Sequence, residues 1–354
     1  MYPAINYFKN PPNKVCILRL SAIGDVCNVI PVVTSLKKYW PKTEITWVIG
    51  SVEYGLVKNL EDIKFQVVNK KDSYLVNYKL LSKHSYDLLI NLHPSWRANI
   101  CSLFIRSEIK LGFDNKRAKD FQTFFCNERI PYREGQHVVD SFLGFLTYLG
   151  FPSEAANWSI LKESIPKFSD TFGATNINKK NIVISPFSGQ RLRNYRDLDS
   201  SKYLDIAKQL SDFGFNVIFT GANSKAEQTF KSLIQETEGY AFNDLIGELS
   251  LIELMSLISC VDLVICPDSG PSHIANALGV NVITLFATSN PKRTGPYNYL
   301  HIAINHYEEN LRRYNKKGIQ DANWGERVRS AEAMNSIRVS EVIAQVKKVL
   351  NESY

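Results

Sequence analysis

The most chemically suggestive part of the chain is residues 264–279, where an apolar strand leads directly into a glycine turn and a helix. Gly270 permits a tight turn, and Pro271 suits the first helical position, where a missing N–H is not needed. The free N–H groups of such a turn and the positive end of the helix dipole form an anion site suited to phosphate. The alternative is a structural helix capped by Asp268 or Ser269. The residues assigned to this candidate phosphate site are Asp268, Ser269, Gly270, Ser272 and His273.

A second candidate is the loop Ser185 to Tyr195, which follows the first apolar run of the second half of the chain. Small residues, among them Ser188, stand beside arginines that include Arg193. This combination suits a loop lying over a pyrophosphate, since a guanidinium neutralises phosphate through paired hydrogen bonds. The alternative is a surface loop with solvated arginines.

A carboxylate at a glycine turn is the third candidate, in Ser21-Ala22-Ile23-Gly24-Asp25. Asp25 stands between an apolar run and residues whose apolar positions have helical spacing. One interpretation makes Asp25 the N-cap of that helix. The other makes it a general base, because a carboxylate at hydrogen-bond range takes a proton from an attacking hydroxyl.

The elements that position these loops alternate between short apolar strands and helices, which predicts parallel sheets covered on both faces. The expected strands of the first half are 15–20, 45–49, 65–68 and 86–92. Those of the second half are 181–185, 215–220, 261–266 and 280–286, with helices between them and a polar linker over 152–180. A last helix, 339–350, is expected to pack back on the first domain. Ligands bind at the carboxyl ends of such strands, so a central cleft between two domains is expected.

Length and composition support this organisation and exclude several classes of protein. The 354 residues exceed one ordinary hydrophobic core, and 44% hydrophobic residues with 22% charged ones is normal for a globular protein. Neither a signal peptide nor an apolar run long enough for a membrane span is recognised, so a cytoplasmic protein, at most peripheral to a membrane, is expected. The six cysteines lack C-x-x-C spacing and are expected to be reduced, buried thiols, not zinc ligands.

The positive charge lies in the first half of the chain. Residues 1–150 hold 20 Lys and Arg against 13 Asp and Glu, a difference of +7, whereas residues 151–354 hold 22 against 22. This asymmetry indicates an anionic partner for the first half, or a solvated face that keeps the protein soluble. No nucleic-acid partner is expected.

Taken together, the three loops resemble the ADP-heptose:lipopolysaccharide heptosyltransferases, glycosyltransferases of family 9 with the GT-B fold. Residues 19–26, RLSAIGDV, resemble the family's R-x-S-x-x-G-D-V element, and residues 268–275, DSGPSHIA, resemble its D-[ST]-G-x-x-H-x-A element. Residues 185–195 are similar to its H-P-G-A-S-x-x-x-K-x-W segment, with Ser185, Arg193 and Tyr195 at the positions of His, Lys and Trp. Within the family, residues 45–50, 111–114, 117–120 and 137–140 look most like heptosyltransferase I, which adds the first heptose to Kdo.

The resemblance implies two Rossmann-like doubly wound domains facing a central cleft, and an inverting transfer of heptose from ADP-heptose to Kdo. Asp25 would be the catalytic base, Arg193 and Ser188 would bind phosphate, and Glu227 would be near the ribose-binding acidic position. The acceptor, anionic lipid A bearing Kdo, would be bound by Ser21, Gly24, Arg97, Lys116, Arg117 and Lys119. No D-x-D pair stands in these loops, and an arginine with a helix N-terminus stabilises the leaving ADP, so no metal or other cofactor is expected.

The resemblance also implies domain limits: an acceptor-binding domain over residues 1–165, a nucleotide-sugar-binding domain over 180–335, and the final helix over 336–354. A monomer in peripheral contact with the cytoplasmic face of the inner membrane is expected. The alternatives are a GT-B transferase with another heptose acceptor or another nucleotide-sugar donor, and a non-enzymatic nucleotide-binding protein. A dinucleotide oxidoreductase is disfavoured, since G-x-G-x-x-G follows neither first strand.

Overall fold

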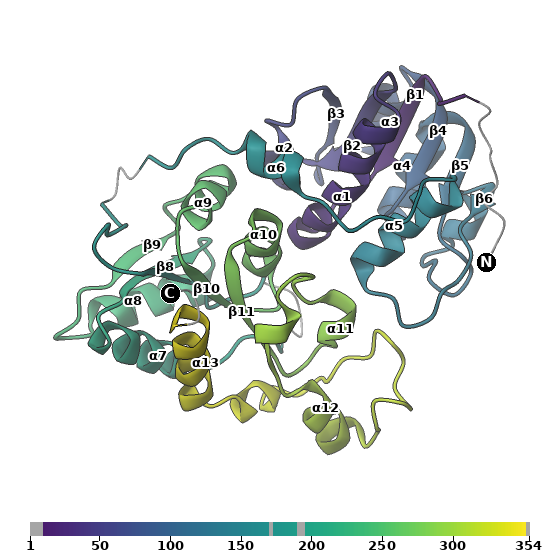
Figure 1. Cartoon of the computed structure of the whole chain (residues 1–354). Helices are drawn as coiled ribbons and strands as arrows, with labels where there is room; N and C mark the ends of the chain where they lie inside the picture. The colour runs from purple at the N-terminus through teal and green to yellow at the C-terminus, as the bar shows by residue number, and fades with distance from the viewer. Residues whose placement is uncertain (1–9, 170–172, 190–194, 352–354) are drawn as a thin grey trace. The chain divides into compact units, whose positions relative to one another are not determined.

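The computed structural model describes residues 10–169, 173–189 and 195–351, and the chain divides into two compact units at Ser164 and Ile165. The split falls one residue from the predicted end of the first domain. Each unit contains one parallel six-stranded sheet with helices between its strands (Figure 1). The prediction of two doubly wound α/β domains is therefore confirmed.

The sheet of the first unit has the strand order β3-β2-β1-β4-β5-β6. This is the doubly wound order, and its direction reverses between β1 and β4, where such sheets bind ligands. The central strands are almost wholly buried, as expected for a sheet covered on both faces. The strands are β1 Lys14–Leu18, β2 Glu44–Gly50, β3 Ile63–Val68, β4 Ser85–Asn91, β5 Arg106–Gly112 and β6 Glu128–Arg129. The helices are α1 Ile23–Tyr39, α2 Ser51–Val57, α3 Tyr74–Leu81, α4 Trp96–Phe104, α5 Val138–Tyr148 and α6 Ser159–Ser164, with a 3₁₀ turn at Gln122–Phe124.

Helix α1 runs through Pro31 without ending there. A proline inside a helix has no N–H to give the carbonyl four residues earlier, which here is that of Cys27. The indole Nε1 of Trp158, a buried side chain that precedes α6, donates to this carbonyl oxygen at 2.8 Å. A distant residue thus supplies the missing donor, and the helix continues to Tyr39.

The second unit repeats the same topology, with the strand order β12-β11-β10-β7-β8-β9 and the switch point between β7 and β10. Its strands are β7 Asn181–Ile184, β8 Asn216–Gly221, β9 Asn243–Ile246, β10 Leu263–Pro267, β11 Asn281–Phe286 and β12 Ile304–Asn305. Its helices are α7 Ser200–Asp212, α8 Lys225–Gln235, α9 Leu251–Ile258, α10 Gly270–Leu278, α11 Pro291–Thr294, α12 Tyr307–Asn310 and α13 Val339–Asn351. Short 3₁₀ or π turns cover Leu300–Ile302, Leu311–Asn315 and Ala333–Ser336.

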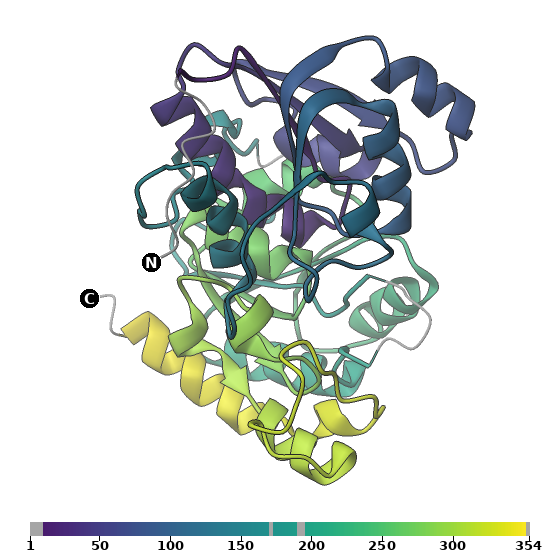
Figure 2. The ribbon, with the colours of Figure 1, turned by 90° about the vertical axis from the view of Figure 1, so that its right-hand side faces the viewer.

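The last helix, α13, belongs to the core of the second unit. Val342, Val346 and Leu350 lie on one face at four-residue spacing and are buried in the same cluster as β7 and α7. The helix packs against α7 and β11, and Figures 1 and 2 show it as a straight yellow helix of this unit. The predicted packing of this helix on the first domain is corrected accordingly, because its apolar face is used within its own unit.

Sequence patterning missed the less apolar strands. Strand β5 alternates between exposed and half-buried residues over most of its length, and β9 contains only four residues. No helix in the described part of the chain is both long and apolar enough to cross a membrane. All six cysteines are free thiols; five are buried as predicted, whereas Cys260 is exposed because it follows the end of α9.

Candidate active site

In the first unit, Asp25 lies in the first turn of α1, just beyond the carboxyl end of β1. The N-cap position is Ala22, so the interpretation of Asp25 as the N-cap is wrong. Asp25 is the third helical residue, and its Oδ2 accepts a hydrogen bond from the Ala22 N–H at 3.4 Å. Its carboxylate also forms an ion pair with Arg19 and is 35% exposed. The carboxylate is therefore anchored by Arg19 and Ala22 and remains partly exposed.

Arg19 is the buried partner that holds Asp25. Its Nη1 donates to the Leu92 carbonyl oxygen at 2.6 Å, while its Nη2 pairs with Asp25. Burial lowers the pKa of the guanidinium, and the neighbouring Asp25 charge opposes that change. Because Arg19 follows β1 and Leu92 follows β4, the guanidinium bridges the two strands at the switch point of the sheet.

His93 follows β4 and faces the same edge of the sheet. Its Nδ1 accepts a hydrogen bond from the Leu20 N–H at 3.1 Å, so that nitrogen carries no proton. Burial, helped by the Arg19 charge, lowers the pKa of His93 to about 3. The imidazole is therefore neutral at physiological pH.

Glu53 and Arg97 complete a cluster of charged residues at the carboxyl ends of β1 to β4. Burial raises the pKa of the Glu53 carboxyl, while the nearby Arg97 and Arg19 charges lower it. The Glu53 carboxylate lies against Gly50, where an added Cβ would stand 2.5 Å from Glu53 Oε2 and 2.4 Å from the Leu20 carbonyl oxygen. Arg97 Nη2 donates to the Val68 carbonyl oxygen at 3.3 Å. A glycine at position 50 therefore lets β1 and α2 approach closely enough to form this cluster.

The predicted acceptor residues have different environments. Ser21 is half-buried and Gly24 is buried beside Asp25, whereas Lys116 and Lys119 are exposed. Lys116 Nζ lies 4.4 Å from the centre of the Tyr132 ring. Arg117 is tied internally: it pairs with Asp114 and donates to Gln136 Oε1, Ser141 Oγ and the Pro131 carbonyl oxygen. Its guanidinium organises the loop after β5.

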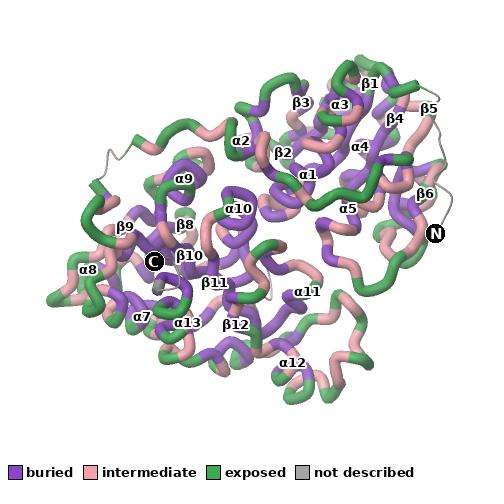
Figure 3. The backbone as a smooth tube through the Cα atoms, in the orientation of Figure 1, coloured by how far each residue is buried: buried purple, intermediate pink, exposed green. Residues whose placement is uncertain are grey.

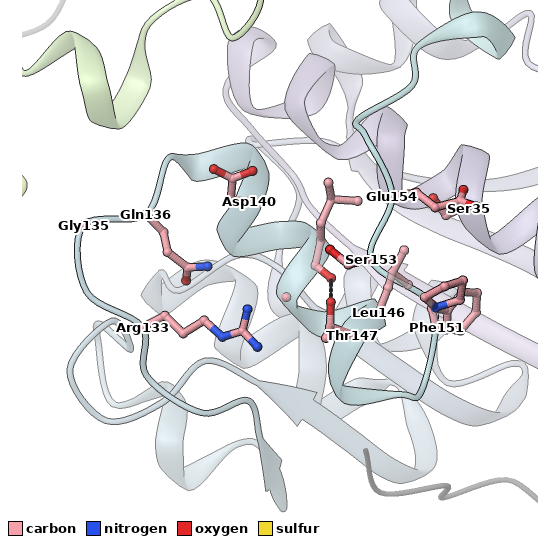
Figure 4. A pocket seen from close by; sticks show the side chains of 13 residues that line it. Ser35, Arg133, Gly135, Gln136, Asp140, Leu146, Thr147, Phe151, Ser153 and Glu154 are labelled. Carbon is pink, nitrogen blue, oxygen red and sulfur yellow. Dashed lines mark hydrogen bonds between the residues drawn. The ribbon is translucent and has the colours of Figure 1, made fainter. Parts of the chain in front are cut away.

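A cavity of about 350 Å³ lies in the first unit between α5 and the chain that follows it (Figure 4). Arg133, Gln136 and Asp140 line one side, and Ser153 and Glu154 line another. None of the six predicted acceptor residues lines this cavity. Arg117 reaches it only indirectly, through its hydrogen bond to Gln136.

In the second unit, α10 begins at Gly270, which is one residue before the predicted start at Pro271 and three residues after the end of β10. Ser269 is the N-cap residue, but its side chain makes no cap hydrogen bond and donates instead to the Pro267 carbonyl oxygen at 3.1 Å. Ser272 is buried, with its Oγ 2.7 Å from Thr284 Oγ1, and His273 is buried as well. An uncapped first turn fits an anion site better than a purely structural cap does.

Asp268 connects the loops on the two sides of the second switch point. Its Oδ2 accepts from Ser289 Oγ at 2.7 Å, and its carbonyl oxygen accepts from Arg196 Nη1 at 2.7 Å. Asp197 in turn accepts from both the N–H and the hydroxyl of Ser188, at 2.8 and 2.7 Å. The loop after β7 and the start of α10 are thus joined. Arg193, the predicted phosphate ligand of this loop, lies outside the described residues.

Glu227 has a structural role that the sequence did not reveal. Together with Ser224 it forms a capping box at the start of α8. Its two carboxylate oxygens accept from the N–H groups of Ala222 and Ser224 at 2.7 and 2.9 Å. The carboxylate is therefore fixed at the carboxyl end of β8, 6% exposed.

The sequence pattern predicted no role for five residues of the two clusters: Arg19, Glu53, His93, Arg196 and Asp197. Arg19 was visible in the motif that contains Asp25, and His93 directly follows an expected strand. Their contribution depends on which strand ends are neighbours, and this is fixed by sheet order. Among residues 10–169, 173–189 and 195–351, no group of three His, Cys, Asp or Glu side chains is arranged to hold a metal ion. That transfer needs no metal stays a prediction.

Two Rossmann-type sheets with charged loops at both switch points are typical of enzymes that bind nucleotide sugars, and the same fold occurs in E. coli heptosyltransferase WaaC with ADP. That structure superposes with a TM-score of 0.73, at 15% identity, over 95% of this chain and 99% of the other. Residues 77–321 match the model of glycosyltransferase family 9 (heptosyltransferase). The chain belongs to this family and has the GT-B fold.

Curated relatives match over nearly the full chain. The lipopolysaccharide core heptosyltransferase OpsX of Haemophilus influenzae is 36% identical over 97% of this chain and 98% of its own length. Lipopolysaccharide heptosyltransferase 3 of Escherichia coli is 25% identical, over 93% and 97% of the two chains. The relatives differ in name and therefore do not identify the acceptor of this protein.

Proposed function

We propose that the protein transfers L-glycero-D-manno-heptose from ADP-heptose to Kdo of the lipopolysaccharide inner core, as heptosyltransferase I does. The observation that carries the proposal is the Asp25 carboxylate, which is anchored by Arg19 and the Ala22 N–H yet is 35% exposed. An oriented and accessible carboxylate is what base-assisted attack by a sugar hydroxyl requires. Family membership supports the transferase class.

In the proposed reaction, the acceptor hydroxyl oxygen attacks the anomeric carbon of heptose on the face opposite the leaving group. The bond from that carbon to the β-phosphate oxygen breaks, and ADP leaves with the bonding electron pair. Asp25 accepts the hydroxyl proton, and the new glycosidic bond has inverted configuration. Arg19 keeps the carboxylate in one orientation during this step.

The donor half of the proposed site belongs to the second unit. The first turn of α10, with Ser269 and Gly270, would bind the pyrophosphate through N–H groups and the helix dipole, while Arg193 neutralises its charge. Ser188 and Asp268 shape the adjoining loops through Asp197 and Arg196. Ser272 and His273 support the turn from their buried positions, and Glu227 has lone pairs left for a ribose hydroxyl.

The acceptor half would use the basic first unit to bind anionic lipid A bearing Kdo. Arg97 lies in the Asp25 cluster, and Lys116 and Lys119 are exposed on the loop after β5. Ser21 and Gly24 border the base, while Arg117 holds the loop in shape. We place the protein at the cytoplasmic face of the inner membrane, acting as a monomer in peripheral contact with lipid.

The test measures heptose transfer to Kdo-lipid A with ADP-heptose, and in parallel with UDP- and GDP-sugars. Asp25→Asn should lower kcat at least 100-fold with the fold intact. Asp205→Asn, at an exposed carboxylate on α7, is the matched control and should transfer at the parental rate. Parental activity in Asp25→Asn would remove Asp25 as the base, and turnover only with another donor would overturn the assignment of ADP-heptose.

The relative named heptosyltransferase 3 gives a specific reason to test a second acceptor. The same enzyme is therefore assayed on Kdo-lipid A and on an acceptor that already carries heptose. Preference for the second acceptor would assign the protein to a later step of core assembly, with the same donor and base.

A further inference from the structure

Helix α3 exposes several large apolar side chains, although its Leu80 and Leu81 pack on the core of the first unit in the usual way. Its exposed side chains are large and apolar: Tyr74 is 59% exposed, Leu75 61%, Val76 50% and Tyr78 46%. The polar Asn77, in contrast, is buried with Leu81 against the unit. A surface helix ordinarily turns its apolar side chains toward the core. The outer side of α3 therefore presents large apolar side chains to solvent, and most residues of this helix are exposed (Figure 3).

The apolar surface continues onto α4, which packs beside α3. Tyr78 contacts Phe104 edge to face, with ring centres 5.5 Å apart, and the adjacent Leu103 is 54% exposed. Trp96 lies seven residues before Leu103, two helical turns away and on the same side of α4, and is 52% exposed. We call Tyr74, Leu75, Val76, Tyr78 and Leu103 the α3–α4 face. Contiguous exposed apolar surface of this kind marks an interaction site.

Lysines border the α3–α4 face. Lys70, Lys71, Lys79 and Lys83 are exposed, and residues 69–84 contain a single acidic side chain, Asp72. Lys79 follows Leu75 by four residues, so both lie on the outer side of the helix. Within the part of the chain that the structure describes, none of these four lysines forms an ion pair with a carboxylate. Their charge is available to an anionic partner.

We propose that the α3–α4 face docks onto an anionic lipid bilayer, with Tyr74, Leu75 and Tyr78 in the interfacial region and the lysines on lipid phosphates. Tyrosine suits the boundary between hydrocarbon and water because its ring is apolar and its hydroxyl is polar. Lysine stems cover apolar surface while their ammonium groups reach the anionic headgroups. A protein partner would need a shape-matched pocket, whereas a bilayer needs only this mixture of apolar and basic side chains.

Docking of the α3–α4 face deepens the proposed function. It rests on that function in one respect, namely that a lipid-borne acceptor would lie in the same bilayer. Docking through α3 would hold the first unit at the membrane surface, where such an acceptor is concentrated. The α3 side chains are separate in sequence from Asp25, Arg19 and His93. Membrane binding and transfer are therefore separable by substitution.

The test is co-flotation of the full-length protein with vesicles of phosphatidylglycerol and phosphatidylcholine, and with vesicles of phosphatidylcholine alone. The unsubstituted protein should bind the anionic vesicles and be released by salt. Leu75→Asp, and separately the triple variant Lys70→Glu, Lys71→Glu, Lys79→Glu, should each bind at least tenfold more weakly. The matched controls Leu233→Asp and Lys225→Glu, at an exposed leucine and lysine of α8, should bind as the parent does.

Two further measurements separate the outcomes. Thermal melting and transfer to a water-soluble acceptor should be unchanged in the α3 variants, so loss of vesicle binding is not loss of folding. Absence of transfer in the parent would overturn the proposed function and leave the vesicle result standing. Equal vesicle binding by parent and α3 variants would overturn the docking proposal. So would a shift from dimer to monomer in light scattering without any change in vesicle binding, since the face would then join two copies of the chain.

Discussion

At the scale of residues, Arg19 makes two interactions at once that a lysine cannot make together. One terminal nitrogen binds the Leu92 carbonyl oxygen and the other pairs with Asp25. Arg19→Lys keeps the charge but loses the planar fork, so Asp25 should lose its fixed orientation. We expect kcat to fall about tenfold or more with little change in the KM for ADP-heptose, measured by steady-state kinetics.

The control for Arg19→Lys is Arg338→Lys, since Arg338 is exposed and pairs with Glu341 at the start of α13. That variant should keep parental kinetics. A rise in KM with unchanged kcat in Arg19→Lys would make Arg19 a substrate-binding group and not a positioning residue.

His93 makes stability depend on pH. Its pKa is about 3 in the folded protein, below the ordinary value of 6.5, so between these values the unfolded chain binds the extra proton. The contribution of His93 is therefore complete above pH 6.5 and is lost as the pH falls toward 3. Because His93 is protonated only in the unfolded chain in this range, the free energy of unfolding should drop by about 2 kcal/mol from pH 8 to pH 5.

Urea denaturation at the two pH values measures this change. His93→Asn keeps an acceptor for the Leu20 N–H and removes the titration, so its pH dependence should be smaller by about 2 kcal/mol. His301→Asn, at an exposed histidine, should retain the parental pH dependence. An undiminished dependence in His93→Asn would show that other groups cause the acid destabilisation.

Local sequence patterns located candidate residues at helix starts but not the residues that contact them. Asp25 and the start of α10 were found because a carboxylate or a glycine next to a helix start is a local pattern. Glu53, His93 and Arg97 become neighbours only because β2, β1 and β4 are adjacent in the sheet. The buried hydrogen bond between Ser272 and Thr284 also depends on packing, so the predicted hydroxyl donor proved to face the core.

At the scale of elements, the pairing of Pro31 with Trp158 allows a quantitative test. Trp158→Phe removes the indole donor and leaves the Cys27 carbonyl buried without it, which should cost about 1–3 kcal/mol. Pro31→Ala restores a backbone N–H that can bind the same carbonyl. In the Pro31→Ala background, Trp158→Phe should therefore lower the free energy of unfolding by at least 1 kcal/mol less than it does in the parent. A double-mutant cycle measured by urea denaturation gives this difference.

The cycle has a clear contrary outcome. If the effects of the two substitutions on the free energy of unfolding simply add, the tryptophan stabilises α1 through apolar packing alone. The hydrogen bond from the indole N–H would then contribute nothing. Trp40→Phe, at another buried tryptophan of the first unit, controls for the loss of ring area.

Element boundaries were predictable where burial dominates the sequence pattern. Strands β1, β7 and β10 are short apolar runs and were located within two residues. Strand β5 was missed because it is mostly exposed or half-buried, and β9 because four residues carry too little periodicity. The position of α13 was wrong for another reason: an amphipathic helix shows which face is buried but not which domain buries it.

At the scale of the whole molecule, the same strand order occurs twice, and in the proposed function each copy carries a different half of the chemistry. The first unit provides the charged cluster around Asp25, and the second provides the start of α10. Each unit has its own apolar core, so each can respond to substitution separately.

Helix α13 provides the test of that independence. Val346 is fully buried in the core of the second unit, and Val346→Asp would place an unpaired carboxylate there, at a cost of roughly 3 kcal/mol or more. Hydrogen exchange should then accelerate in the strands of residues 165–351 and ADP affinity should fall, while residues 10–164 keep their protection. Ala344→Asp, on the exposed side of the same helix, should leave both readouts unchanged. If protection in the first unit fell to the same extent, the two units would unfold as one cooperative body, and α13 would stabilise the charged cluster around Asp25 as well as the donor site.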